Sequence, residues 1–397
     1  MESIRVTRNA VIPDPLRISR YQKAPEFGPR ILFFSGGSAI NGLSKTLKGY
    51  THNSIHLVTP FDSGGSSAKL RDAFTMPAIG DLRSRLLALA DETVTGHPEV
   101  FRLFNYRLPK NKPQSELKEM LAALAAGKAP LIEDITNPMR SLIRYQLGFF
   151  QDAMPKDFDL RGASIGNLIL AGGYLNNHQH LDPIIFLFSK LVNVLGTVRA
   201  LVNKNLHLAA DLEDGRRVNG QHRLTGKEVE PLTSPIKRLY LSQDRDQLVP
   251  GHAQLRKKVR KLIESAELIC YPPGSFYSSL IANLIPAGVG KAIAANDCPK
   301  IYIPNLGHDP EQTGMNTTQA IDSILCQLRK DAGKDTPTSS LVNFVLLDSQ
   351  NGIYGTPVSP DEIKKRGICL IDTKLVSKQS APYYDNNLLV SALLSLV

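Results

Sequence analysis

Cysteines are scarce and widely separated in this chain, which contains four of them, Cys270, Cys298, Cys326 and Cys369. No two of them form a Cys-x-x-Cys pair, so the sequence favours neither a zinc ribbon nor a disulfide framework. We therefore expect reduced thiols that pack in the core.

Long hydrophobic runs are missing as well. The longest apolar stretch, residues 184–195, is interrupted by polar side chains and falls short of the roughly 20 apolar residues that span a bilayer. The first residues carry several charges and no apolar segment followed by a cleavage site, so they do not predict a secretory signal. We expect a cytoplasmic protein without a membrane partner.

The signatures of several common enzyme classes are also absent. No complete G-x-G-x-x-G or G-x-x-x-x-G-K-[ST] motif occurs, so a standard NAD site and a P-loop are not supported. Ser-His-Asp partners cannot be assigned from the order of the residues alone, so a hydrolase is not favoured. His178 with His180, and His52 with His56, form pairs that lack a third ligand. The pattern of histidines therefore does not favour a zinc site.

Composition and charge are those of a folded protein. Of 397 residues, 42% are hydrophobic and 21% are charged, which is close to ordinary globular usage. The formal net charge of +10 suits an anionic ligand. Basic residues are scattered except between Arg256 and Lys261, so a nucleic-acid partner is not supported, and a homo-oligomer is left open.

The order of strand and helix patterns indicates an α/β fold. Residues 30–34 predict a buried strand that runs into glycines, and residues 55–59 predict a second strand one helical interval later. This spacing is typical of a right-handed crossover between parallel strands. Strand and helix patterns alternate again from residue 238 to residue 371. We expect a Rossmann-like, mainly parallel, doubly wound sheet after an N-terminal extension of residues 1–29.

Two segments interrupt this alternation. Residues 91–160 are mainly helical in pattern and predict a helical insertion that covers the site. Residues 197–225 contain strand-like runs around Asp214-Gly215, a pair typical of a tight hairpin, and predict a small antiparallel β excursion. With both segments included, residues 30–397 form one predicted α/β domain.

Six glycine-rich or polar loops follow predicted strands or begin predicted helices, where backbone N–H groups can bind phosphate. Turn glycines and helix caps are the ordinary alternative at such positions. We predict ligand contacts by Gly36, Gly37 and Ser38, by Gly64, Gly65, Ser66, Ser67 and Lys69, by Asp81 and Arg83, by Asn167, by Gly274, Ser275 and Ser279, and by Asn305. The second loop, which contains Asp62 and Arg71, brings a carboxylate, backbone amides and cations together, and such a segment can hold anions and a hydrated metal.

Taken together, these loops resemble those of the 2-phospho-L-lactate transferase (CofD-like) family, and within it the YvcK type. The resemblance is carried by residues 35–40, 62–71, 80–83, 162–170, 273–279 and 305–313, and it extends over residues 30–397. It implies a Rossmann-like fold and one of two activities. One is magnesium-dependent transfer of a phospholactyl group from an activated nucleotide diphosphate to an alcohol. For this activity the resemblance implies Asp62 and Arg71 as catalytic residues and Asp62 as a ligand of Mg²⁺. The other is binding of a uridine-diphosphate sugar without turnover.

The chain departs from the YvcK pattern at several positions. Ser63 replaces the second of two adjacent aspartates, which weakens the predicted magnesium site, and Ala163 stands where the pattern has histidine. Glu311-Gln312 stands where the pattern has Gly-Glu. Three hypotheses follow: a phosphorus-group transferase, a nucleotide-sugar sensor, and a scaffold with a vestigial site. The first two require a nucleotide-diphosphate or phosphate-ester ligand.

Overall fold

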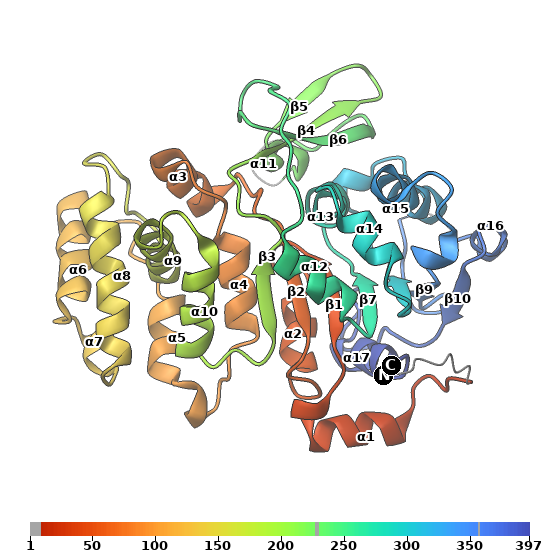
Figure 1. The fold of residues 1–397 in the computed structure, drawn as a ribbon, viewed down its shortest axis with the longest axis horizontal. Coiled ribbons are helices and arrows are strands. Elements are labelled where there is room, and N and C mark those ends of the chain that lie inside the picture. Colours follow the sequence, from red (N-terminus) through yellow and green to blue (C-terminus); the bar gives the residue numbers. More distant parts are fainter. Residues whose placement is uncertain (1–8, 227–229, 356–357) are drawn as a thin grey trace.

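A seven-stranded parallel sheet forms the centre of the computed structural model, which describes residues 9–226, 230–355 and 358–397 (Figure 1). Its strand order is β10-β9-β8-β7-β1-β2-β3. The strands are β1 (Ile31–Ser35), β2 (Ile55–Val58), β3 (Thr197–Ala200), β7 (Leu268–Tyr271), β8 (Lys300–Tyr302), β9 (Phe344–Leu347) and β10 (Cys369–Asp372). The order reverses between β1 and β7, and ligands of doubly wound folds bind at the carboxyl ends of strands at such a point. The predicted Rossmann-like α/β class is confirmed.

Helices cover both faces of this sheet because its strands are apolar on both sides. Ile31 and Phe33 of β1 face one core and Leu32 and Phe34 face another, and all four are fully buried. The first face is covered by α2 (Asn41–Leu47) and α17 (Asn386–Leu394). The second is covered by α12 (Lys257–Glu264), α13 (Ala282–Leu284), α14 (Val289–Ala294) and α15 (Thr317–Ala332), while α16 (Pro360–Lys365) contacts β10.

A helical region continues beyond the β3 edge of the sheet (Figure 1). It comprises α3 (Gly65–Phe74), α4 (Gly80–Ala88), α5 (Pro98–Asn105), α6 (Gln114–Ala126), α7 (Pro130–Glu133), α8 (Met139–Ala153), α9 (Ile165–Asn176) and α10 (Leu181–Leu191). These helices share an apolar core with β2 and β3. The helical segment predicted for residues 91–160 is therefore part of a larger layer.

A separate three-stranded antiparallel sheet confirms the predicted β excursion, with two corrections. It contains β4 (His207–Leu212), β5 (Arg217–Asn219) and β6 (Ile236–Ser242), and α11 (Gln221–Leu224) follows β5. Residues 197–200, predicted as part of the excursion, form β3 and pair in parallel with β2. Strand β6, predicted as part of the main sheet, pairs antiparallel with β4 instead. Gly215, with φ of +86°, lies in the turn between β4 and β5, as predicted.

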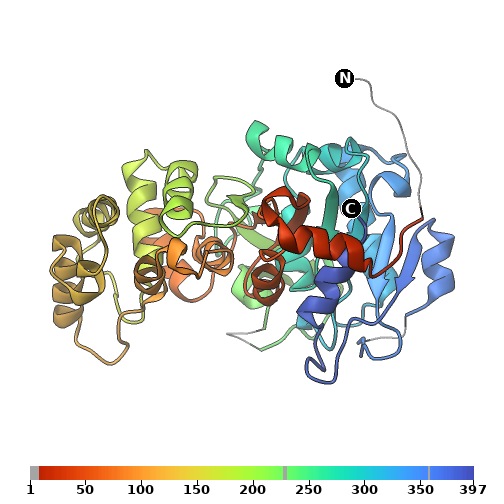
Figure 2. The same cartoon turned by 90° about the horizontal axis from the view of Figure 1, so that it is seen from below.

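The segment before β1 also differs from its prediction as a simple extension. It contains α1 (Pro15–Lys23), which begins at the N-cap Asp14 and packs against α17 (Figure 2). Of the four cysteines, all of them free thiols, Cys270 is buried whereas Cys326 and Cys369 are exposed, so the prediction of core positions is wrong for these two. Within the described residues, no helix has the length and apolar character needed to cross a membrane.

Candidate functional site

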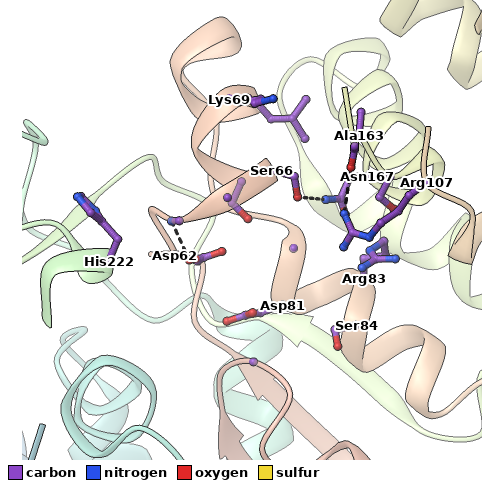
Figure 3. A pocket seen from close by; sticks show the side chains of 18 of the residues that line it. Asp62, Ser66, Lys69, Asp81, Arg83, Ser84, Arg107, Ala163, Asn167 and His222 are labelled. Carbon is purple, nitrogen blue, oxygen red and sulfur yellow. Dashed lines mark hydrogen bonds between the residues drawn. The ribbon is translucent and has the colours of Figure 1, made fainter. Parts of the chain in front are cut away.

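A cavity of about 690 Å³ opens at the carboxyl ends of β1 and β2 (Figure 3). It is bounded by the loops after these strands, by the first turns of α3, α4 and α9, and by α11 beside the small sheet. The predicted site residues that line it are Gly37, Ser38, Asp62, Gly64, Gly65, Ser66, Ser67, Lys69, Asp81, Arg83, Asn167, Ser275 and Ser279. The fold thus brings five of the six predicted loops to one cavity.

Three helix N-termini face this cavity without capping side chains. The N-cap residues of α3, α4 and α9 are Gly64, Ile79 and Ser164, and none of them makes a side-chain hydrogen bond to its helix. The first N–H groups of a helix need acceptors from outside the helix, and the helix dipole favours negative charge there. An anion in the cavity would supply both.

Arg83 provides a buried positive charge at the same place. Its side chain runs from α4 across α9, where a Cβ on Gly166 would lie only 2.9 Å from Arg83 Cδ. The residue is 9% exposed, and its Nε has no hydrogen-bond partner among the described residues. Burial, together with the charge of Arg107, lowers the pKa of Arg83 to about 10. The guanidinium remains charged at neutral pH and has no counter-ion in the part of the chain that the structure describes.

Two more cations, which sequence reasoning missed, line the cavity near Arg83. Arg107 donates through Nη1 to the carbonyl of Gly162 at 3.2 Å. The Lys110 side chain packs on the same glycine, where a Cβ would lie 3.2 Å from its Cε. Both residues lie between α5 and α6, outside any recognised motif. No sequence motif identifies them. The isolated antiparallel β-bridge between Arg107 and Ser164, which brings this segment to the start of α9, is visible only in the fold.

The carboxylates of Asp62 and Asp81 lie on the sheet side of the cavity (Figure 3). Asp62 accepts a hydrogen bond through Oδ1 from the N–H of Gly64 at 3.1 Å. A Cβ on Gly80 would lie 3.6 Å from Asp62 Oδ2, and a Cβ on Gly37 would lie 3.2 Å from Asp81 Oδ1. Glycine therefore allows the backbone of these two loops to lie close to both carboxylates.

These two carboxylates define what the site offers a metal ion. No group of three or more histidine, cysteine, aspartate or glutamate side chains suited to a metal occurs among the described residues. Mg²⁺ is commonly held by one or two carboxylates together with phosphate oxygens and water. Asp62 and Asp81 fit that mode and do not form a metal site by themselves.

Ser63, which stands where the family pattern has a second aspartate, does not line the cavity where a metal ion would bind. Its Oγ lies 2.8 Å from His222 Nδ1 and accepts the backbone N–H of His222 at 3.1 Å. These contacts attach the loop after β2 to α11, which lines the other side of the cavity with Gln221, His222 and Thr225. The sequence alone did not identify these three residues as part of the site.

Lys69 and Asn167 line the cavity but are held by other side chains. Lys69 Nζ lies 2.7 Å from a carboxylate oxygen of Asp159, which neutralises its charge. Asn167 donates to Ser66 Oγ at 3.1 Å, while its own Oδ1, which is buried, has no partner among the described residues. Asn167 is thus placed to accept a hydrogen bond from a ligand.

Arg71, predicted as catalytic, does not line the cavity. Its guanidinium is buried and donates to the carbonyls of Phe61 and Asp62 at 3.2 and 2.9 Å, and to Asn205 Oδ1 at 2.7 Å. Arg85 supports the loop after β1 in the same way, through the carbonyl of Gly37 at 3.0 Å. We correct the assignment of Arg71, because its hydrogen-bonding groups are used to position the Asp62 loop.

Three predicted ligand residues also lie outside the cavity. Gly36 packs against Ser279, whose Oγ would lie 2.3 Å from a Cβ at that position. The N–H of Gly274 donates to Asn305 Oδ1 at 2.7 Å, and Asn305 Nδ2 donates back to the carbonyl of Gly274 at 2.8 Å. These two residues hold the fifth and sixth loops together, so their polar groups are not free for a ligand.

Three further amides of the fifth loop, those of Phe276, Tyr277 and Ser278, bind carboxylates. Glu311, which is 2% exposed, accepts the N–H groups of Tyr277 at 2.7 Å and Ser278 at 2.8 Å. Asp309 accepts the N–H of Phe276 at 2.9 Å. Burial, with the nearby charge of Asp309, raises the pKa of Glu311 to about 7. These three amides are therefore not available to a phosphate, whereas Ser275 and Ser279 of the same loop line the cavity.

The sheet topology and the cation-lined cavity at its strand ends define a Rossmann-like α/β protein. The sequence profile of the family described as "2-phospho-L-lactate transferase CofD" matches residues 31–376. The chain belongs to the CofD family.

Relatives and a solved structure agree with this assignment. The chain is 28% identical over 341 residues to the "Gluconeogenesis factor" of Bacillus subtilis, covering 85% of this chain and 82% of that protein. It is 29% identical over 286 residues to the "Gluconeogenesis factor" of Listeria monocytogenes, covering 71% and 68%. The crystal structure of a UPF0052 family member from Bacillus halodurans superposes with a TM-score of 0.67 at 22% identity, over 92% of this chain and 99% of that one. This last similarity concerns the fold.

Proposed function

We propose that this chain binds a nucleoside diphosphate or a related phosphate ester in the cavity, with phosphate at the first turns of α3 and α9 and beside Arg83. The observation that carries the proposal is Arg83, a buried guanidinium without a counter-ion among the described residues. A buried charge without a partner is costly, and phosphate oxygens match the geometry of a guanidinium. Arg107 and Lys110, which line the same cavity, add to the attraction.

Asp62 and Asp81 are the residues that would hold Mg²⁺ against the phosphates. The bound ion would offset phosphate charge and polarise the diphosphate. Asn167 would accept a hydrogen bond from the sugar or base through its free Oδ1. The amides of α3 and α9 would orient the phosphate without any change in their own position.

A thermal-shift screen tests the proposal. Uridine, guanosine and adenosine diphosphates and their sugar esters are added with and without Mg²⁺, because a ligand that binds the folded state raises Tm. Arg83→Gln should abolish the shift or weaken the affinity by roughly tenfold to a hundredfold, as expected for a charge-assisted pair. Arg260→Gln, which removes the same charge from exposed α12, is the matched control. A flat screen, or equal shifts in both variants, would refute the proposal.

The presence of Asp62 and Asp81 in one cavity favours a second candidate function, transfer of the ligand's phospho-acyl group to an acceptor alcohol. The acceptor oxygen would form a bond to the outer phosphorus, the bond from this phosphorus to the bridging oxygen would break, and the nucleoside monophosphate would leave. The name of the family supports this function, whereas the YvcK-type resemblance supports binding of a uridine-diphosphate sugar without turnover. Release of nucleoside monophosphate that depends on an alcohol and is lost in Asp62→Asn would establish transfer. Saturable binding without release would establish the alternative.

A further inference from the structure

Helix α8 presents an exposed face at the end of the molecule, with α6 and α7 beside it (Figures 1 and 2). Its outward residues recur every three or four positions, which places them on one stripe of the helix. They border an open groove of about 550 Å³ between α8 and α6, lined by Ser141, Arg144, Tyr145, Gly148, Phe149 and Asp152. None of these residues lines the cavity described above.

Gly148 lies in the middle of this 15-residue helix. Glycine at such a position destabilises a helix by about 1 kcal/mol relative to alanine. Apart from the adjacent residues and the backbone of α8 itself, no atom of the described residues lies within 4 Å of a Cβ placed on Gly148. Packing within the chain therefore does not require glycine here, whereas the close approach of another surface would.

Apolar side chains lie on both sides of Gly148. Tyr145 is 61% exposed and Leu142 is 41% exposed. The rings of Tyr145 and Phe149 form an edge-to-face pair with centroids 5.1 Å apart. Exposed aromatic residues grouped on one face are typical of protein interfaces.

Opposite charges lie four residues before and after Gly148. Arg144 donates through Nε to the carbonyl of Ala125, and neither Arg144 nor Asp152 has an ion-pair partner within the described part of the chain. In an antiparallel pair of identical helices that cross at Gly148, each Arg144 faces the Asp152 of the other copy. The stripe is therefore complementary to itself, which a two-fold interface requires.

We propose that two copies of this chain associate through α8, antiparallel, with Gly148 at the two-fold axis. Gly148 allows the helices to approach closely, the Tyr145 and Phe149 rings pack beside it, and two symmetric pairs of Arg144 with Asp152 fix the register. Because the groove and the cavity share no lining residue, each copy keeps its ligand site.

Sedimentation equilibrium over a range of protein concentrations tests this interface. The wild-type chain should form a dimer, and Asp152→Arg should weaken it by about tenfold or more because it places two arginines together. The double variant Asp152→Arg with Arg144→Glu restores opposite charges and should recover most of the affinity. Glu264→Arg, the same change on exposed α12, should dimerise like wild type.

Gly148→Leu provides a readout that does not depend on charge. Leucine favours the helix more than glycine does, so the isolated subunit should unfold at a higher Tm while the dimer weakens. A wild-type chain that stays monomeric would overturn the proposal, and the exposed face of α8 would then be a surface for a different protein. A dimer unaffected by Asp152→Arg and Gly148→Leu would also overturn it.

Discussion

The loops after β2 and β7 are similar in sequence, yet they differ in what their amides bind. The loop after β2 leads to α3, whose N-cap Gly64 has no capping side chain and whose first turn lines the cavity. The loop after β7 places the amides of Phe276, Tyr277 and Ser278 on Asp309 and Glu311. Whether a glycine-rich loop is available to an anion therefore depends on side chains that lie more than thirty residues away in the sequence.

Among changes to these two loops, we expect Arg71→Ala to have the largest effect on stability. Arg71 holds the carbonyls of Phe61 and Asp62, so its removal leaves buried acceptors unpaired and the loop after β2 unsupported. We expect the free energy of unfolding to fall by about 3–5 kcal/mol, measured by urea denaturation. Arg217→Ala on the exposed β5 should change it little. A loss below about 1 kcal/mol would contradict a supporting role.

The substitution Glu311→Gln tests whether the carboxylate that binds the loop after β7 makes the stability of the protein depend on pH. The folded-state pKa of about 7 lies above the ordinary 4.5, so protonation is favoured in the folded state. This group's contribution to stability is present below about pH 4.5 and is lost as pH rises through 7. Glutamine can accept both amides and donate to Ser278 Oγ at every pH.

The variant should therefore exceed wild type in stability at about pH 8, by on the order of 2 kcal/mol, and should lose this advantage near pH 4. Urea denaturation over a pH series measures the difference. Parallel pH curves for the two proteins would show that the Glu311 carboxyl does not titrate in this range.

Ser63→Ala should give the smallest effect. It removes the hydrogen bonds to His222 that attach the loop after β2 to α11. We expect the free energy of unfolding to fall by about 1 kcal/mol and ligand affinity to stay within a few fold of wild type. Thermal denaturation and titration calorimetry measure the two quantities. A loss of affinity above tenfold would mean that Ser63 contacts the ligand.

Much of the fold could be predicted because it depends on local patterns. Buried strands that run into glycines identified β1 and β2, and Asp214-Gly215 identified a hairpin. Pairing partners are set by contacts distant in sequence, so residues 197–200 and 238–241 were assigned to the wrong sheets. The strand patterns themselves were predicted correctly.

The site could be predicted where a loop directly follows a strand, as at Asp62 and Gly64. Arg71 was misassigned because sequence does not show which carbonyls its guanidinium will meet. Arg107 and Lys110 were missed because they lie between two helices, and only the folding of that segment onto Gly162 brings them to the cavity. Long side chains from neighbouring elements are thus the part of the site that local motifs do not show.

The contact between α1 and α17 has a consequence for how the chain folds during synthesis. The N–H of Asp14 donates to Ser395 Oγ at 2.8 Å, across a separation of 381 residues. A contact between such distant residues forms only after residue 395 has left the ribosome. Until then α1 has no docking site, and the sheet face that α17 covers stays exposed. We expect this face to be the stretch of the nascent chain that most needs protection by a chaperone.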